Sequence, residues 1–144
     1  MKVERSTEIS APPERVYEVV MDPRRLDEWV TIHDALVSAP DGELREGSEL
    51  TQGLRLAGRR IKVHWKVVQD DRPRRVVWEG KGPLHSHARV VYEFEPNEDG
   101  TKFSYTNEYD LPGGALGRIA GRTVSRRTEK EVDKTLERLK KLFH

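Results

Sequence analysis

The chain has 144 residues, a formal net charge of +1 from 26 Lys and Arg against 25 Asp and Glu, and no cysteine. Charges that nearly cancel create no field of one sign, so the composition does not favour nucleic-acid binding, and the lack of cysteine excludes disulfides, thiolate metal ligands and cysteine nucleophiles. No apolar run reaches the roughly 18 residues of a membrane span, and residues 1–10 lack the apolar region of a signal peptide. We therefore expect one domain, residues 1–144, that is cytoplasmic and not inserted in a membrane.

The N-terminal segment predicts a strand followed by two short helices. Residues 3–10 alternate loosely between apolar and polar side chains, as strands do. Pro12-Pro13-Glu14 is a suitable helix start, because proline at the first helical position loses no useful N–H and glutamate complements the helix dipole. Asp22-Pro23 ends this helix and starts another. The apolar residues at helical spacing are Val16, Val19 and Val20 in the first helix and Leu26 and Trp29 in the second.

The middle of the chain predicts six strands joined by turns. Turn sequences such as Asp41-Gly42 and Asn97-Glu98-Asp99-Gly100 separate the segments. The segments are 32–39, 47–56, 59–70, 74–81, 84–95 and 101–111. One face of these strands is mostly apolar or aromatic and the other mostly charged, which indicates an antiparallel sheet with one buried face.

The C-terminal segment predicts one long amphipathic helix that covers the apolar face of the sheet. Its apolar stripe contains Leu116, Ala120, Val124, Val132, Leu136, Leu139 and Phe143. Thr128 interrupts the stripe, either because it faces a solvated cavity or because the helix is exposed or rolled at that point.

This order of elements resembles the helix-grip fold of the START and Bet v 1-like (SRPBCC) superfamily. The residues that carry the resemblance are Ile9-x-Ala11-Pro12-Pro13-Glu14-x-Val16-Tyr17, Asp22-Pro23, Trp29, Asp71-x-Pro73-x-Arg75-Val76, Gly100-Thr101 and Leu136-x-x-Leu139-Lys140. Over nearly its whole length the chain is similar to the polyketide cyclase/dehydrase and lipid-transport branch. The resemblance implies an α+β helix-grip fold: a curved seven-stranded antiparallel sheet, two short helices and a long C-terminal helix that together enclose a cavity.

The inward face of the predicted sheet favours a ligand cavity over a fully packed interior, which is the alternative. Buried tyrosine hydroxyls need hydrogen-bond partners, which a cavity holding water or a ligand provides. An apolar lining with a few directed polar groups is typical of ligand sites. The predicted ligand-binding residues are Trp65, Trp78, Tyr92, Tyr105, Asn107, Tyr109, Val124 and Thr128.

Catalysis in such a cavity would need an acid or a base. The candidates are Tyr109, which would orient or protonate an enolate oxygen, and Asn107, which would bind one; we expect no inward Asp, Glu or His. We therefore expect a protein that binds or transports a small hydrophobic ligand (a lipid, polyketide, isoprenoid or aromatic compound) without a cofactor. The alternatives are a polyketide aromatase/cyclase or dehydratase, and a protein-interaction module resembling the activators of large chaperones that share this fold.

The histidines do not predict a metal site. His85 and His87 are expected on one face of the strand 84–95, with His64 on the same outer side of the sheet. A metal ion needs a further ligand at close range, and the strand between His64 and the pair imposes a separation of about 10 Å. We expect no metal and no nucleic-acid partner; a homodimer is compatible with the sequence.

Overall fold

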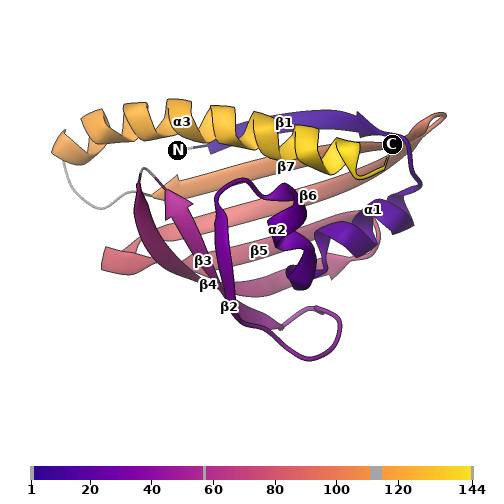
Figure 1. Ribbon diagram of the computed structural model, residues 1–144, viewed down its shortest axis with the longest axis horizontal. Coiled ribbons are helices and arrows are strands. Elements are labelled where there is room, and N and C mark those ends of the chain that lie inside the picture. The colour runs from indigo at the N-terminus through magenta and orange to yellow at the C-terminus, as the bar shows by residue number, and fades with distance from the viewer. Residues whose placement is uncertain (1, 57, 111–114, 144) are drawn as a thin grey trace.

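The computed structural model describes residues 2–56, 58–110 and 115–143; for 115–125 and 127 it describes the helical backbone but not the side chains. The elements are β1 Lys2–Ile9, α1 Pro13–Val20, the 3-10 turn η1 Pro23–Arg25, α2 Leu26–Trp29, β2 His33–Ser38, β3 Glu49–Leu56, β4 Arg59–Asp71, β5 Arg75–Lys81, the 3-10 turn η2 Pro83–His85, β6 His87–Asn97, β7 Gly100–Asp110 and α3 Ala115–Lys141. α3 runs along β1 above the sheet, and α1 and α2 lie toward the end of the sheet where α3 finishes (Figure 1).

The seven strands form one antiparallel sheet in the order β1-β7-β6-β5-β4-β3-β2. Strands β2 to β7 pair with their neighbours in sequence, and β1 returns to pair with β7. The predicted α+β helix-grip fold, with a curved seven-stranded sheet and a long C-terminal helix, is therefore confirmed.

The short helices close one end of the space between sheet and α3. Pro13 occupies the first turn of α1, and the Asp22 side chain caps η1 by accepting from the Arg24 amide at 3.0 Å. Trp29, at the end of α2, is fully buried, and its ring meets that of Tyr92 edge-on at 6.1 Å. This end of the interior is consequently filled by protein atoms.

The C-terminal half of α3 packs on the sheet through the predicted stripe. Val132, Leu136 and Leu139 are buried, and Phe143 is partly buried against the same core. Arg5 of β1 fixes the helix from the side by donating to Asp133 at 2.9 Å. The side chains of the remaining stripe residues, Leu116, Ala120 and Val124, lie outside the described residues.

One predicted strand begins in the wrong place. Strand β6 starts at His87, not at residue 84, because residues 83–85 form the turn η2, in which Leu84 and His85 have left-handed φ of 55° and 60°. Pro83 explains the difference, because a residue without an N–H suits the first position of a turn and not a strand interior. The prediction that His85 and His87 share a strand face is therefore wrong.

A buried carboxylate ties α1 to β4 and to the loop before β3. The side chain of Asp70 is 3% exposed; its Oδ1 accepts from the Tyr17 hydroxyl at 2.8 Å and its Oδ2 from the Arg72 guanidinium at 2.9 Å. Arg72 also donates to the carbonyl of Leu44 at 3.1 Å. Burial and the hydrogen bond to Asp70 raise the pKa of Tyr17, so its hydroxyl stays a donor.

None of the described helices is both long and apolar enough to span a bilayer.

Candidate ligand cavity

A cavity of about 150 Å³ lies on the inner face of the sheet, under α3 and beside α2. Strands β3 to β7 form most of its wall, and α2 and α3 contribute Leu26 and Thr128. Seven of the predicted ligand-binding residues line it: Trp65, Trp78, Tyr92, Tyr105, Asn107, Tyr109 and Thr128. The eighth, Val124, has a side chain outside the described residues.

Small residues in the middle of the sheet make room for the cavity. The cross-strand row that begins at Trp65 continues through Gly80 and Ala88 to Tyr109, so two large rings flank two small residues. A Cβ placed on Gly80 would lie 2.7 Å from the Trp65 ring and 2.8 Å from Val63. The absence of a side chain at Gly80 therefore allows the Trp65 ring to pack closely against β5, and the small side chain of Ala88 adds little bulk beside it.

A continuous set of aromatic rings holds the wall in place. The ring centroids of Trp65 and Trp78 are 5.9 Å apart, those of Trp78 and Tyr92 5.7 Å, and those of Tyr92 and Tyr105 5.4 Å. Such edge-on and tilted pairs are favourable beyond their buried area. The lining is thus largely aromatic and includes three tyrosines, Tyr92, Tyr105 and Tyr109.

Gln52 is a polar residue of the wall that the sequence interpretation missed. It is 4% exposed; its Oε1 accepts from the Trp65 indole at 3.0 Å, and its Nε2 lies 2.9 Å from Nδ1 of His33. The alternation of Leu50, Gln52 and Leu54 along one face of β3 is the sequence signal that identifies it as inward.

Two polar atoms of the lining residues have no hydrogen-bond partner among the described residues. These are the indole N–H of Trp78 and Oδ1 of Asn107, both buried. An unpaired buried polar group costs about 1–3 kcal/mol, so such groups in native proteins call for an explanation. Here they provide a donor and an acceptor that a bound molecule can use.

Charged groups are confined to the rim of the cavity. Among the described lining residues, the ionisable carboxylate and imidazole are Asp110 and His87, which pair across β6 and β7 and are both exposed to solvent. No described Lys, Arg or Glu contributes to the lining. The deep part of the cavity therefore presents neutral hydrogen-bonding groups only.

Burial raises the pKa of Tyr105 to about 12, which makes the stability of the fold sensitive to alkaline pH. An unfolded tyrosine ionises near pH 10, so the unfolded chain loses its proton first and stability falls as pH rises from about 10 toward 12. In Tyr105→Phe, we expect the free energy of unfolding to fall less steeply across this range, by about 1 kcal/mol per pH unit. Urea titrations at several pH values measure this slope, and equal slopes in variant and wild type would contradict it.

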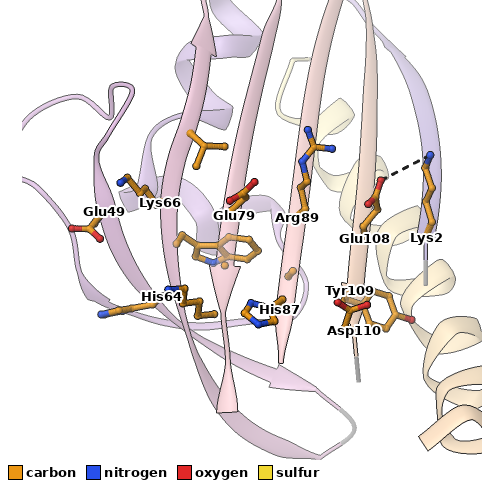
Figure 2. A pocket seen from close by; sticks show the side chains of 15 residues that line it. Lys2, Glu49, His64, Lys66, Glu79, His87, Arg89, Glu108, Tyr109 and Asp110 are labelled. Atoms are coloured by element: carbon orange, nitrogen blue, oxygen red, sulfur yellow. Dashed lines mark ion pairs between the residues drawn. The ribbon is translucent and has the colours of Figure 1, made fainter. Parts of the chain in front are cut away.

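A second, larger hollow lies on the outer face of the sheet and has the opposite chemistry. Its volume is about 820 Å³ and most of its lining is charged (Figure 2). Opposite charges alternate strand by strand in register: Glu49, Lys66, Glu79, Arg89, Glu108 and Lys2. The row neutralises itself, as in the Lys2–Glu108 ion pair at 3.9 Å, so it offers neither an apolar surface nor a net charge to a ligand.

The outer face also contains the histidines that the sequence analysis considered. His64, Lys81 and His87 are successive in one cross-strand row, so β5 separates the two imidazoles as predicted. His64 contacts Thr51 through Nδ1. Among the described residues, no group of three or more His, Cys, Asp or Glu is placed to hold a metal ion.

A curved antiparallel sheet gripped by a long C-terminal helix, with an aromatic cavity between them, defines the helix-grip class. Residues 1–144 match the family model described as polyketide cyclase / dehydrase and lipid transport, and the chain belongs to this family. The uncharacterized protein Rv1546 of Mycobacterium tuberculosis is 28% identical over 141 residues, which are 98% of this chain and 97% of that protein.

Solved structures agree in fold. TTHA0849 from Thermus thermophilus has a TM-score of 0.79 at 21% identity, and the match covers 98% of this chain and 95% of that one. DynU16, a protein in the dynemicin biosynthetic locus, has a TM-score of 0.67 at 13% identity; the match covers 97% of this chain and 46% of that one.

Proposed function

We propose that this protein binds a small, neutral, apolar ring compound non-covalently in the cavity under α3. The observation that carries the proposal is the cavity itself: about 150 Å³, walled by aromatic and aliphatic side chains, with charged groups only at the rim of the described lining. Membership in the polyketide cyclase/dehydrase and lipid-transport family supports a hydrophobic ligand in general terms.

Cavity size favours a ligand of about one aromatic ring. An apolar protein cavity of about 150 Å³ accommodates benzene, whereas sites for drug-sized ligands start at about 300 Å³. Among the ligand classes expected from the sequence, a small aromatic compound therefore suits this structure better than a lipid or a multi-ring polyketide, which would have to displace part of the wall.

Lining chemistry favours a neutral ligand that has a hydroxyl group. A buried carboxylate without a cationic partner is strongly disfavoured. A hydroxyl group is both an acceptor and a donor, so it suits a lining in which the Trp78 indole N–H and Asn107 Oδ1 have no partner among the described residues. Phenol combines the required size, neutrality and hydrogen-bonding capacity.

A panel of three single-ring compounds of similar shape tests the proposal: phenol, toluene and benzoate. We expect phenol to bind more tightly than toluene, and benzoate not to bind, in isothermal titration calorimetry. At 100 times its dissociation constant, a ligand adds about 2.7 kcal/mol of stability, which raises Tm by roughly 5–10 °C for a chain of this length. The proposal would be refuted if neither phenol nor toluene stabilised the protein, or if benzoate bound more tightly than both.

A second candidate is an aromatase/cyclase or dehydratase reaction, favoured by the position of Asn107 and Tyr109 two residues apart in the β7 wall of the cavity. In that reaction Asn107 would bind an enolate oxygen and Tyr109 would orient or protonate it. The described deep lining holds no carboxylate or imidazole for proton abstraction, so non-catalytic binding remains the conclusion. Chromatography of the bound compounds after incubation separates the two, because a carrier returns its ligand unchanged.

A further inference from the structure

The orientation of the Gln52 side-chain amide is fixed by a donor that cannot act as an acceptor. The Trp65 indole N–H is a donor only, so the Gln52 atom 3.0 Å from it must be the oxygen Oε1. The amide nitrogen Nε2 consequently faces away from Trp65. Because Gln52 is 4% exposed, it cannot exchange these partners for water without opening the wall.

This orientation fixes the protonation state of His33. Nε2 of Gln52 is a donor and lies 2.9 Å from Nδ1 of His33, so Nδ1 must accept and carry no proton. The imidazole is therefore neutral, with its proton on Nε2. A hydrogen-bonded chain thus runs from a half-buried histidine on β2 through Gln52 to the cavity wall.

The groups around His33 leave it neutral near pH 7. Burial lowers the pKa of His33, while the carboxylates of Asp27 on α2 and Asp34 on β2 raise it to a smaller extent. Asp34 is itself paired with Arg55 of β3 at 3.5 Å and Arg60 of β4 at 3.8 Å, which weakens its effect on the imidazole. From α3, the carboxylate of Glu131 accepts from Thr31, two residues before His33.

We propose that His33 is a positioning residue for the ligand cavity: its neutral imidazole orients Gln52, and protonation of His33 reverses the Gln52 amide, frees the Trp65 indole and weakens ligand binding. A proton taken from water onto Nδ1 would place two donors, Nδ1–H and Nε2–H, against each other. Rotation of the amide relieves this contact by presenting Oε1 to His33, but it then sets Nε2 against the indole N–H of Trp65. The ligand-binding part of this inference rests on the proposed function.

The indole N–H resonances of the ligand-free protein directly test the hydrogen-bonded connection from His33 through Gln52 to Trp65. In ¹H–¹⁵N spectra recorded between about pH 8 and pH 5, we expect the Trp65 N–H resonance, assigned with Trp65→Phe, to shift with the same midpoint as the His33 ring. His33→Asn keeps an acceptor near the Nδ1 position but does not titrate, so it should abolish the shift. An unmoved Trp65 resonance in wild type, or an unchanged shift in His33→Asn, would overturn the proposal.

His64→Asn is the matched control. His64 lies on β4 and also contacts a β3 side chain, Thr51, through Nδ1, but it does so on the outer face of the sheet. We expect His64→Asn to retain the full pH-dependent shift of the Trp65 resonance. Loss of the shift in this control would show that the response arises on the outer face, against the proposal.

Phenol affinity gives the functional readout, because phenol itself stays neutral below about pH 10. We expect its Kd to rise about tenfold between pH 7.5 and pH 5 in wild type, because the Gln52–Trp65 hydrogen bond that holds the wall in place is lost, and to stay constant in His33→Asn. Binding without pH dependence overturns the inference but leaves the proposed function intact. Absence of binding at both pH values overturns the proposed function, while the resonance experiment still decides the role of His33.

Discussion

Gly100→Ala is expected to lower the free energy of unfolding by about 4 kcal/mol, an exceptional effect for a single methyl group. Gly100 has φ of +145°, a region that side chains with a Cβ rarely adopt. A Cβ there would lie 2.3 Å from the carbonyl oxygen of Ile9 and 2.8 Å from the amide nitrogen of Ala11. These neighbours are backbone atoms of the last residue of β1 and of the segment that follows it, so the clash can be relieved only by moving the backbone.

Gly58→Ala provides the control for this prediction. Gly58 also has a positive φ, of +78°, but no described atom lies within 4 Å of the position that a Cβ would take there. This variant should lose only about 1 kcal/mol, the cost of a left-handed residue. Urea denaturation of both variants measures the difference, and equal losses would mean that backbone conformation, not the contact with β1, determines the requirement for glycine at position 100.

The Gly100 site illustrates what the sequence predicts well. A turn at residues 97–100 follows from local turn chemistry, and the strands on either side follow from an alternation that tertiary packing reinforces, as in Phe94 and Phe103, paired across β6 and β7. The start of β6 is less predictable because Pro83 allows either a strand end or a turn, and the left-handed conformations of Leu84 and His85 have no glycine to signal them.

The cavity, too, is predictable from the sequence only in part. Inward aromatic residues on β4 to β7 are predictable from strand alternation, because every second side chain faces the same way. The same alternation places Gln52 inward, between Leu50 and Leu54, but it does not show which groups the amide of Gln52 contacts. Its contact with His33 depends on the pairing of β2 with β3, which contains irregular register shifts after His33 that no sequence pattern indicates.

The space beside Gly80 is also invisible in the sequence. A glycine within a strand indicates close approach of another group, but not which group approaches. Only the three-dimensional register shows that Trp65 occupies this place and that Ala88 is the next residue of the row. The size of the cavity, and therefore the class of ligand, depends on these two small residues, Gly80 and Ala88.

Ala88→Phe is accordingly expected to weaken phenol binding by at least about 100-fold. Ala88 lies in the cavity wall, and a phenyl ring at this position would occupy the space that we assign to the ligand. Excluding one ring removes roughly 2–3 kcal/mol of apolar burial, equivalent to about two orders of magnitude in Kd. The added ring fills existing space, so thermal unfolding should show a folded protein of similar stability.

Arg89→Phe is the matched control, because it places the same ring one residue further along β6, on the opposite face. Arg89 borders the outer hollow, and its loss removes one member of an exposed charge row, which costs little stability. Ala88 borders both hollows, whereas Arg89 borders the outer one and not the cavity, so calorimetric titration of both variants with phenol separates the two. Loss of binding in Ala88→Phe alone places the ligand under α3; loss in Arg89→Phe alone would place it on the charged outer face and contradict the proposed function, because a self-neutralising row of charges has no physical reason to retain a neutral ring.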